Sequence, residues 1–161
     1  MANNHTAGAA ARTFAPSELC QRMLAKTSKG TCGPCILYLE DGTIFYGRAC
    51  GAEGTATGEV CFNTSLEGYF EVMTDPSYAG QIVTMTYPQI GNYGIDETDV
   101  QSAFPGDAVR PASAPAMRGM IVRDMCATPS NWRSAVSVPE YLRAHGIVAI
   151  EGVDTRALVR H

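Results

Sequence analysis

Two strand-like runs joined by an Asp-Gly pair constrain the fold of this chain more than any other feature. Ile36–Glu40 and Thr43–Gly47 are rich in β-branched and aromatic residues, and only Asp41 and Gly42 separate them. Such a pair is the preferred two-residue connection of a β-hairpin, because it tolerates the positive φ angles that this turn requires. The sequence therefore predicts an antiparallel hairpin over residues 36–47.

Four later segments also have the pattern of strands. Residues 59–64, 119–123 and 147–150 each contain a short apolar run, and residues 81–87 alternate with a period of two before a proline. Between the strands at 59–64 and 81–87 we expect a polar loop and a turn. A further turn is expected at 91–94, where glycine and asparagine are concentrated.

Helix signals are concentrated near the C-terminus. Ser137 and Glu140 have the spacing of a capping box, and Gly146 suits the position just after a helix end. These residues predict a helix that begins after Ser137 and runs to about residue 145. Asp154 is expected to cap a second helix over residues 155–160.

The order of these elements predicts one domain of mixed α/β class, with strands in the first two thirds and helices mainly near the C-terminus. We place this domain at residues 36–161, and its length is sufficient for one hydrophobic core. Residues 1–35 are expected to be an extension, largely disordered, in which residues 17–26 could form a short helix. A helical turn is expected at 96–102 and an exposed, proline-rich loop at 104–115.

Composition limits the function classes. Hydrophobic residues make up 45% of the chain and charged residues 17%, which is typical of a soluble globular protein. No apolar run approaches the roughly 20 residues of a membrane span. There is no basic stripe with interleaved aromatic residues, so nucleic-acid binding is not expected. The absence of a secretory signal, together with free thiols, predicts a cytoplasmic chain.

A Cys-x-x-Cys motif offers one candidate chemistry. Cys32 and Cys35 flank Gly33 and Pro34, which is the sequence of the thioredoxin dithiol. That chemistry requires the first cysteine at the N-terminus of a helix that follows a strand, whereas this motif follows a loop and precedes the predicted strand 36–40. We therefore expect the pair to be linker sequence rather than a thiol redox site. Two thiolates are also too few for a structural zinc site, so no metal site is predicted.

Nucleophilic catalysis is not supported by the sequence either. The three histidines, His5, His145 and His161, lie in an arm, at a helix end and at the last position, and no nucleophile elbow is present. We predict no catalytic residue. The turn formed by Asp75, Pro76 and Ser77 should direct the Ser77 hydroxyl outward, although a hydrogen bond within the turn would equally explain this serine.

Several motifs in one order support a resemblance to a known family. They begin with Leu39-Glu40-Asp41-Gly42-Thr43, Gly58–Ser65, Gly68-Tyr69, Thr74-Asp75-Pro76-Ser77-Tyr78 and Pro88–Gly94, and they continue with Gly119–Asp124, Asn131-Trp132-Arg133, Tyr141-Leu142, Ile147–Ile150 and Asp154–Leu158. In these features the chain resembles the N-terminal domain of the small, glutamine-hydrolysing subunit of carbamoyl phosphate synthetase. The resemblance covers about residues 36–161 and implies a swivelling β/β/α domain.

The resemblance also implies a function. In this family the small subunit hydrolyses glutamine, and ammonia passes to the large subunit, which makes carbamoyl phosphate from bicarbonate and two ATP. Hydrolysis belongs to a C-terminal amidotransferase domain with a Cys-His-Glu triad, and no segment of this sequence resembles it. The N-terminal domain is therefore expected to dock on the large subunit and to line the glutamine site, without activity of its own.

By match to the family motif, Ser77 is the residue expected to contact glutamine. No cofactor is expected on this chain, since ATP and Mg²⁺ belong to the large subunit. Expected partners are the large subunit, the amidotransferase domain and glutamine. Two other functions stay open at this point: a free-standing interaction module that uses the same docking surface, and a thiol redox protein that uses Cys32 and Cys35. The product could serve pyrimidine or arginine synthesis.

Overall fold

A computed structural model describes residues 33–95, 114–130 and 136–161. The short helix predicted at 17–26, the helical turn at 96–102 and almost all of the loop at 104–115 lie outside the described residues. The elements that carry the candidate site all lie within them.

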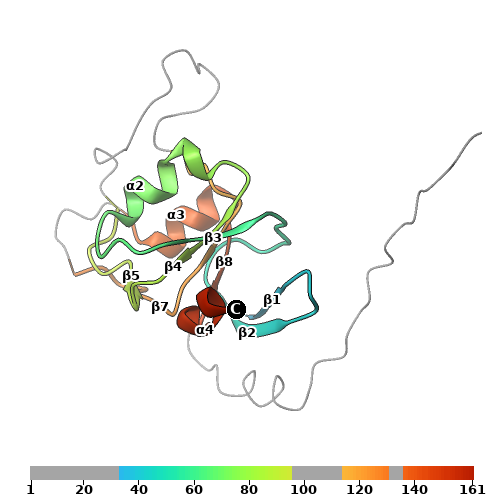
Figure 1. The fold of residues 1–161 in the computed structure, drawn as a ribbon. Coiled ribbons are helices and arrows are strands. Elements are labelled where there is room, and N and C mark those ends of the chain that lie inside the picture. Colours follow the sequence, from blue (N-terminus) through green and yellow to red (C-terminus); the bar gives the residue numbers. More distant parts are fainter. Residues whose placement is uncertain (1–32, 96–113, 131–135) are drawn as a thin grey trace, which may run out of the picture. The chain divides into compact units, whose positions relative to one another are not determined.

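A six-stranded sheet forms the centre of the domain (Figure 1). Its strand order is β1-β2-β8-β6-β4-β3. The first three of these strands are antiparallel neighbours, and the remaining neighbours are parallel. The sheet is therefore mixed. The bounds of its strands are β1 Pro34–Tyr38, β2 Ile44–Ala49, β3 Val60–Asn63, β4 Ile82–Met85, β6 Gly119–Ile121 and β8 Val148–Glu151.

The predicted hairpin is confirmed, but its turn differs from the prediction. Strand β1 begins two residues earlier than expected, and Tyr38 pairs with Ile44. The backbone N–H of Leu39 donates to the Thr43 carbonyl at 2.9 Å, so three residues rather than two form the connection. Within this connection only Gly42 has a positive φ, of 93°. The chain thus uses the three-residue loop in which glycine alone takes the left-handed position.

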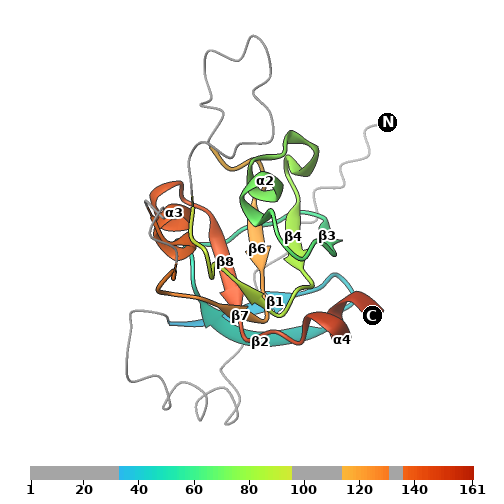
Figure 2. The same ribbon diagram turned by 90° about the vertical axis from the view of Figure 1, so that its left-hand side faces the viewer.

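The helices cover the sheet on both faces (Figure 2). Helices α2 (Tyr69–Thr74) and α3 (Val138–Ala144) lie over one face, and α4 (Thr155–Arg160) lies beside the β1-β2 hairpin on the other. Each face has its own hydrophobic cluster. Met73, Met120 and Leu142 belong to the cluster under α2 and α3, whereas Ile121 and Leu158 belong to the opposite one.

Both predicted helix caps near the C-terminus are confirmed. The Ser137 side chain accepts from the Glu140 backbone N–H, and the Glu140 carboxylate accepts from the Ser137 backbone, which completes the capping box. Gly146 follows the helix with a φ of 70°. The Asp154 side chain accepts from the N–H of Ala157 at 3.0 Å and begins α4.

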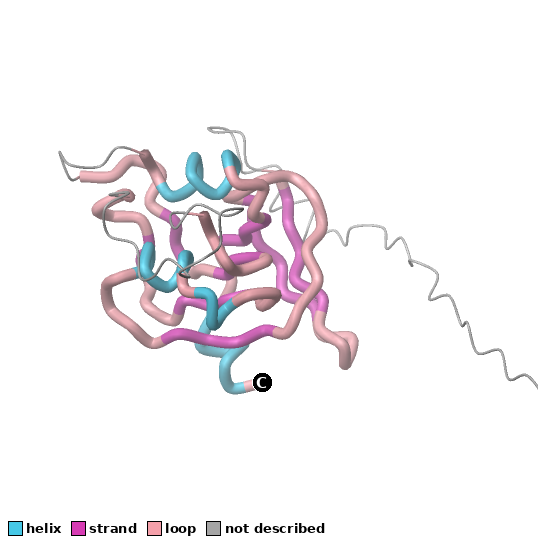
Figure 3. The backbone as a smooth tube through the Cα atoms, turned by 90° about the horizontal axis from the view of Figure 1, so that it is seen from above, coloured by secondary structure: helices cyan, strands magenta, loops and turns pink. Residues whose placement is uncertain are grey.

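Some elements differ from the sequence-based expectation. The segment expected to be a polar loop after β3 contains α2, and a 3₁₀ turn, η1 (Pro76–Tyr78), follows it. A second, two-stranded parallel sheet pairs β5 (Gln89–Ile90) with β7 (Asp124–Met125). The turn at 91–94 is confirmed, since the Gly94 N–H donates to the Gly91 carbonyl. Figure 3 shows how much of the described chain runs in loops between these short elements.

The mixed α/β class, with helices mainly toward the C-terminus, is confirmed. Within the described residues, none of the helices has both the length and the apolar character needed to cross a membrane.

Candidate functional site

The turn that carries Ser77 is built by its neighbours. Asp75 caps η1, because its Oδ1 accepts from the Ser77 backbone N–H at 2.8 Å. The Ser77 side chain is exposed, and its hydroxyl makes no hydrogen bond to any described residue. The sequence-based prediction that the Ser77 side chain points outward is therefore confirmed. The local hydrogen bond that was the alternative explanation is made by the backbone N–H of Ser77 and not by its hydroxyl.

Helix α2 determines where this turn begins. Tyr69, Phe70, Met73 and Thr74 are buried, and these positions place one face of the helix against the core. At its C-terminal end the Asp75 N–H donates to the Glu71 carbonyl at 2.9 Å. The turn therefore follows directly from a helix that is fixed by packing.

An aromatic pair holds the other end of α2. The Tyr93 phenol oxygen accepts from the backbone N–H groups of Gly68 at 2.8 Å and Tyr69 at 3.3 Å, and so caps a helix that has no side-chain cap of its own. The two tyrosine rings stack with centroids 4.2 Å apart, and the Tyr69 hydroxyl donates to the Gly94 carbonyl at 2.7 Å. Burial raises the pKa of the Tyr69 phenol.

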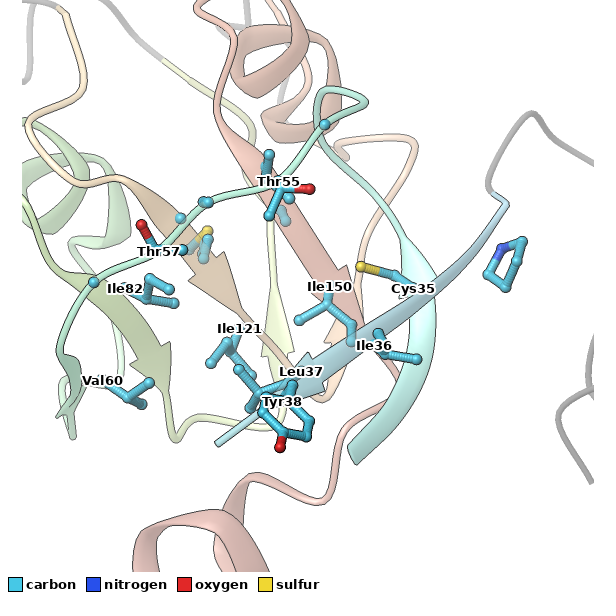
Figure 4. Close-up of a pocket in the computed structure, with 18 residues that line it drawn as sticks. Cys35, Ile36, Leu37, Tyr38, Thr55, Thr57, Val60, Ile82, Ile121 and Ile150 are labelled. Atoms are coloured by element: carbon cyan, nitrogen blue, oxygen red, sulfur yellow. The ribbon is translucent and has the colours of Figure 1, made fainter. Parts of the chain in front are cut away.

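An apolar groove lies on the opposite face of the sheet, with a volume of about 570 Å³. It is bounded by β1, the loop at residues 54–58 and the strands β3, β4, β6 and β8. Figure 4 shows side chains from five strands around this space: Leu37, Val60, Ile82, Ile121 and Ile150. Its size suits a small-molecule pocket, but its lining is mainly hydrocarbon, and its polar side chains are Cys35, Tyr38, Thr55 and Thr57.

The described cysteine of the Cys-x-x-Cys motif does not lie in a redox environment. Cys35 is part of β1 and lines the groove, whereas Cys32 lies outside the described residues. Burial raises the pKa of the Cys35 thiol, and also that of Cys61. Dithiol chemistry also places the motif at the N-terminus of a helix, whereas Cys35 lies within a strand. The structure therefore gives no support to the thiol redox alternative.

Both described histidines contact side chains other than Ser77. His161 Nε2 lies 2.6 Å from the Asp41 carboxylate at the hairpin turn. The Thr43 backbone N–H and, after it, this His161 contact lower the pKa of Asp41. His145 packs against the Tyr141 ring. No group of three or more potential metal ligands occurs among residues 33–95, 114–130 and 136–161. In these segments no base contacts the Ser77 hydroxyl.

The described residues thus define a mixed α/β domain with an exposed serine on a capped 3₁₀ turn. Comparison with known proteins gives the particular family. The chain belongs to the carbamoyl-phosphate synthase small chain family, whose CPSase-domain model matches residues 37–161. The resemblance inferred from the motifs is confirmed.

Individual relatives agree with this assignment. The chain is 56% identical over 126 residues to the carbamoyl phosphate synthase small chain of Solidesulfovibrio magneticus, 55% identical over 126 residues to that of Syntrophotalea carbinolica, and 54% identical over 125 residues to that of Thermotoga maritima. Each match covers 78% of this chain but only 31%, 31% and 29% of the relative. The chain therefore spans less than a third of the length of these relatives.

Proposed function

We propose that this chain supplies the N-terminal, non-catalytic domain of the small subunit of a glutamine-hydrolysing carbamoyl phosphate synthetase. In this role it docks on the large subunit, and residues 36–161 form one wall of the glutamine site. The observation that carries the proposal is the Ser77 hydroxyl, which is exposed on a capped turn and bonded to no described residue. The Thr-Asp-Pro-Ser-Tyr motif of the family falls on this same turn.

The chemistry required of Ser77 is modest. A hydroxyl both donates and accepts, so it suits a polar ligand such as the carboxylate, ammonium or amide groups of glutamine. Its backbone is held by Asp75 and by the end of α2, so little conformational entropy is lost when the ligand binds. Bond breaking belongs to the amidotransferase domain, and ATP and Mg²⁺ are used on the large subunit. The chain alone is expected to catalyse no step.

The test is a Ser77→Ala substitution in the complete complex. Loss of one hydrogen bond to the substrate, worth about 1 kcal/mol, should raise the glutamine KM by about fivefold. Carbamoyl phosphate synthesis from added ammonia should not change, because ammonia bypasses the glutamine site. Ser130→Ala is the matched control, since Ser130 is also exposed and its hydroxyl donates to the Asn92 carbonyl. An unchanged glutamine KM in Ser77→Ala would remove Ser77 from the site.

A further inference from the structure

A hydrogen bond ties the Ser77 turn to the central sheet. Tyr78, the last residue of η1, receives a hydrogen bond at its phenol oxygen from the Asn63 side-chain amide at 3.0 Å. Asn63 is the last residue of β3 and lies 15 positions earlier in the chain. The Tyr78 ring is partly buried and packs against the core cluster under α2. The residue beside Ser77 is therefore anchored by both packing and a polar contact.

The Asn63 amide is itself held in one orientation. Its Oδ1 accepts from the Ser65 backbone N–H at 2.7 Å, so the Nδ2 is left to donate to Tyr78. The Asn63 backbone carbonyl accepts from both the N–H of Thr86, at 3.0 Å, and the Thr86 hydroxyl, at 3.1 Å. These hydrogen bonds hold Asn63 at the end of the β3-β4 pair. They therefore also fix the position of the side-chain amide that donates to Tyr78.

This anchor matters because the turn is short. A 3₁₀ turn of three residues has poor internal hydrogen-bond geometry and is easily displaced. Asp75 holds its first residues through the Ser77 N–H, and Tyr78 holds its end. Ser77 lies between these two fixed points. Without the hydrogen bond to Asn63, the Asp75 cap, the backbone hydrogen bonds of the turn and the packing of the Tyr78 ring would remain, and no polar side-chain contact would hold the Tyr78 end.

We propose that Asn63 and Tyr78 form a positioning pair that fixes the Ser77 hydroxyl toward bound glutamine. The proposal rests on the proposed function of Ser77, and it assigns a role to two residues outside the substrate contact itself. The pair acts through Ser77. Its loss should therefore weaken glutamine use selectively and leave the ammonia-dependent reaction intact.

The experiment measures glutamine-dependent and ammonia-dependent synthesis in the complete complex. Tyr78→Phe removes only the hydroxyl and keeps the ring, so it should raise the glutamine KM by about three- to fivefold with unchanged ammonia-dependent kcat. The glutamine KM of Asn63→Asp should stay near that of the parent complex, because the carboxylate can accept hydrogen bonds from both the Ser65 N–H and the Tyr78 hydroxyl. Asn63→Ala should raise the glutamine KM by the same factor as Tyr78→Phe. Tyr87→Phe is the control, since Tyr87 is exposed and its hydroxyl bonds to no described residue.

A double variant separates positioning from a direct or purely structural role. If Tyr78 acts through Ser77, Ser77→Ala combined with Tyr78→Phe should have the same glutamine KM as Ser77→Ala alone. An additional increase in the double variant would overturn the proposal, as would an equal loss of both activities in Tyr78→Phe. A Tyr78→Phe complex with an unchanged KM, while Ser77→Ala raises it, would refute the pair but keep the function of Ser77. If Ser77→Ala itself has no effect, both ideas fail.

Discussion

Thr84 provides a direct test of how the core of this domain is arranged. It lies on β4, has no exposed surface, and its hydroxyl oxygen has no hydrogen-bond partner among the described residues. Because side chains alternate along a strand, Thr84 faces the same side as Ile82, and its register partner on β6 is Ile121. Both isoleucines belong to the cluster opposite α2. A buried hydroxyl in such surroundings carries a desolvation cost of about 1–3 kcal/mol.

Thr84→Val removes this hydroxyl and puts a methyl group of similar size in its place. We expect the free energy of unfolding to increase by about 1–2 kcal/mol, since part of the gain is lost to the slightly larger group. Urea denaturation followed by circular dichroism measures the change at constant m-value.

Thr74→Val is the matched control for this change. Thr74 is also buried, but its hydroxyl donates to the Phe70 and Glu71 carbonyls at 3.1 and 3.2 Å. The free energy of unfolding of Thr74→Val should be about 1 kcal/mol lower than that of the parent protein. A destabilised Thr84→Val protein would refute the reasoning, because it would mean that the hydroxyl has a stabilising partner.

Two further predictions concern the capping box of α3 and the close approach of β2 to β8 at Gly47. Ser137→Ala should cost about 1 kcal/mol of stability at pH 7. The Ser137 hydroxyl and backbone N–H lower the pKa of Glu140, so this carboxylate stabilises the fold above its ordinary pKa of about 4.3 and stops doing so as the pH falls through the lowered value. Denaturation at pH 7 and pH 3 should therefore show a smaller effect of Ser137→Ala in acid, and an equal effect would contradict the pairing. At Gly47 a Cβ would lie 2.3 Å from the Glu151 carbonyl, so Gly47→Ala should cost about 2 kcal/mol or more, whereas Gly33→Ala, with nothing within 4 Å, should change stability by less than about 0.5 kcal/mol.

The elements that could be predicted from sequence are those whose signals are local. The hairpin follows from residues that are adjacent in the chain, and the α3 cap from Ser137 and Glu140, three positions apart. The exposed Ser77 also follows from its own tripeptide, because Asp75 supplies the cap. In each case the determining contact spans only a few residues.

The features that were missed depend on distant contacts. Helix α2 begins at a left-handed Gly68, and the phenol oxygen that caps it comes from Tyr93, 25 residues later. Tyr69 and Met73 are one helical turn apart, but a helix of six residues is too short for such spacing to predict it. The tie from Asn63 to Tyr78 likewise depends on the β3-β4 pairing, which no local pattern specifies.

The most direct test of the account is an exchange of domains. Residues 37–161 would replace the matching segment in the small chain of Solidesulfovibrio magneticus, to which they are 56% identical, and the product would be combined with the large subunit from that organism. We predict that the chimera binds the large subunit and supports glutamine-dependent carbamoyl phosphate synthesis at a rate within about tenfold of the parent complex. A chimera that folds but neither binds the large subunit nor supports the glutamine reaction would contradict the proposed function. That result would instead favour a free-standing interaction module.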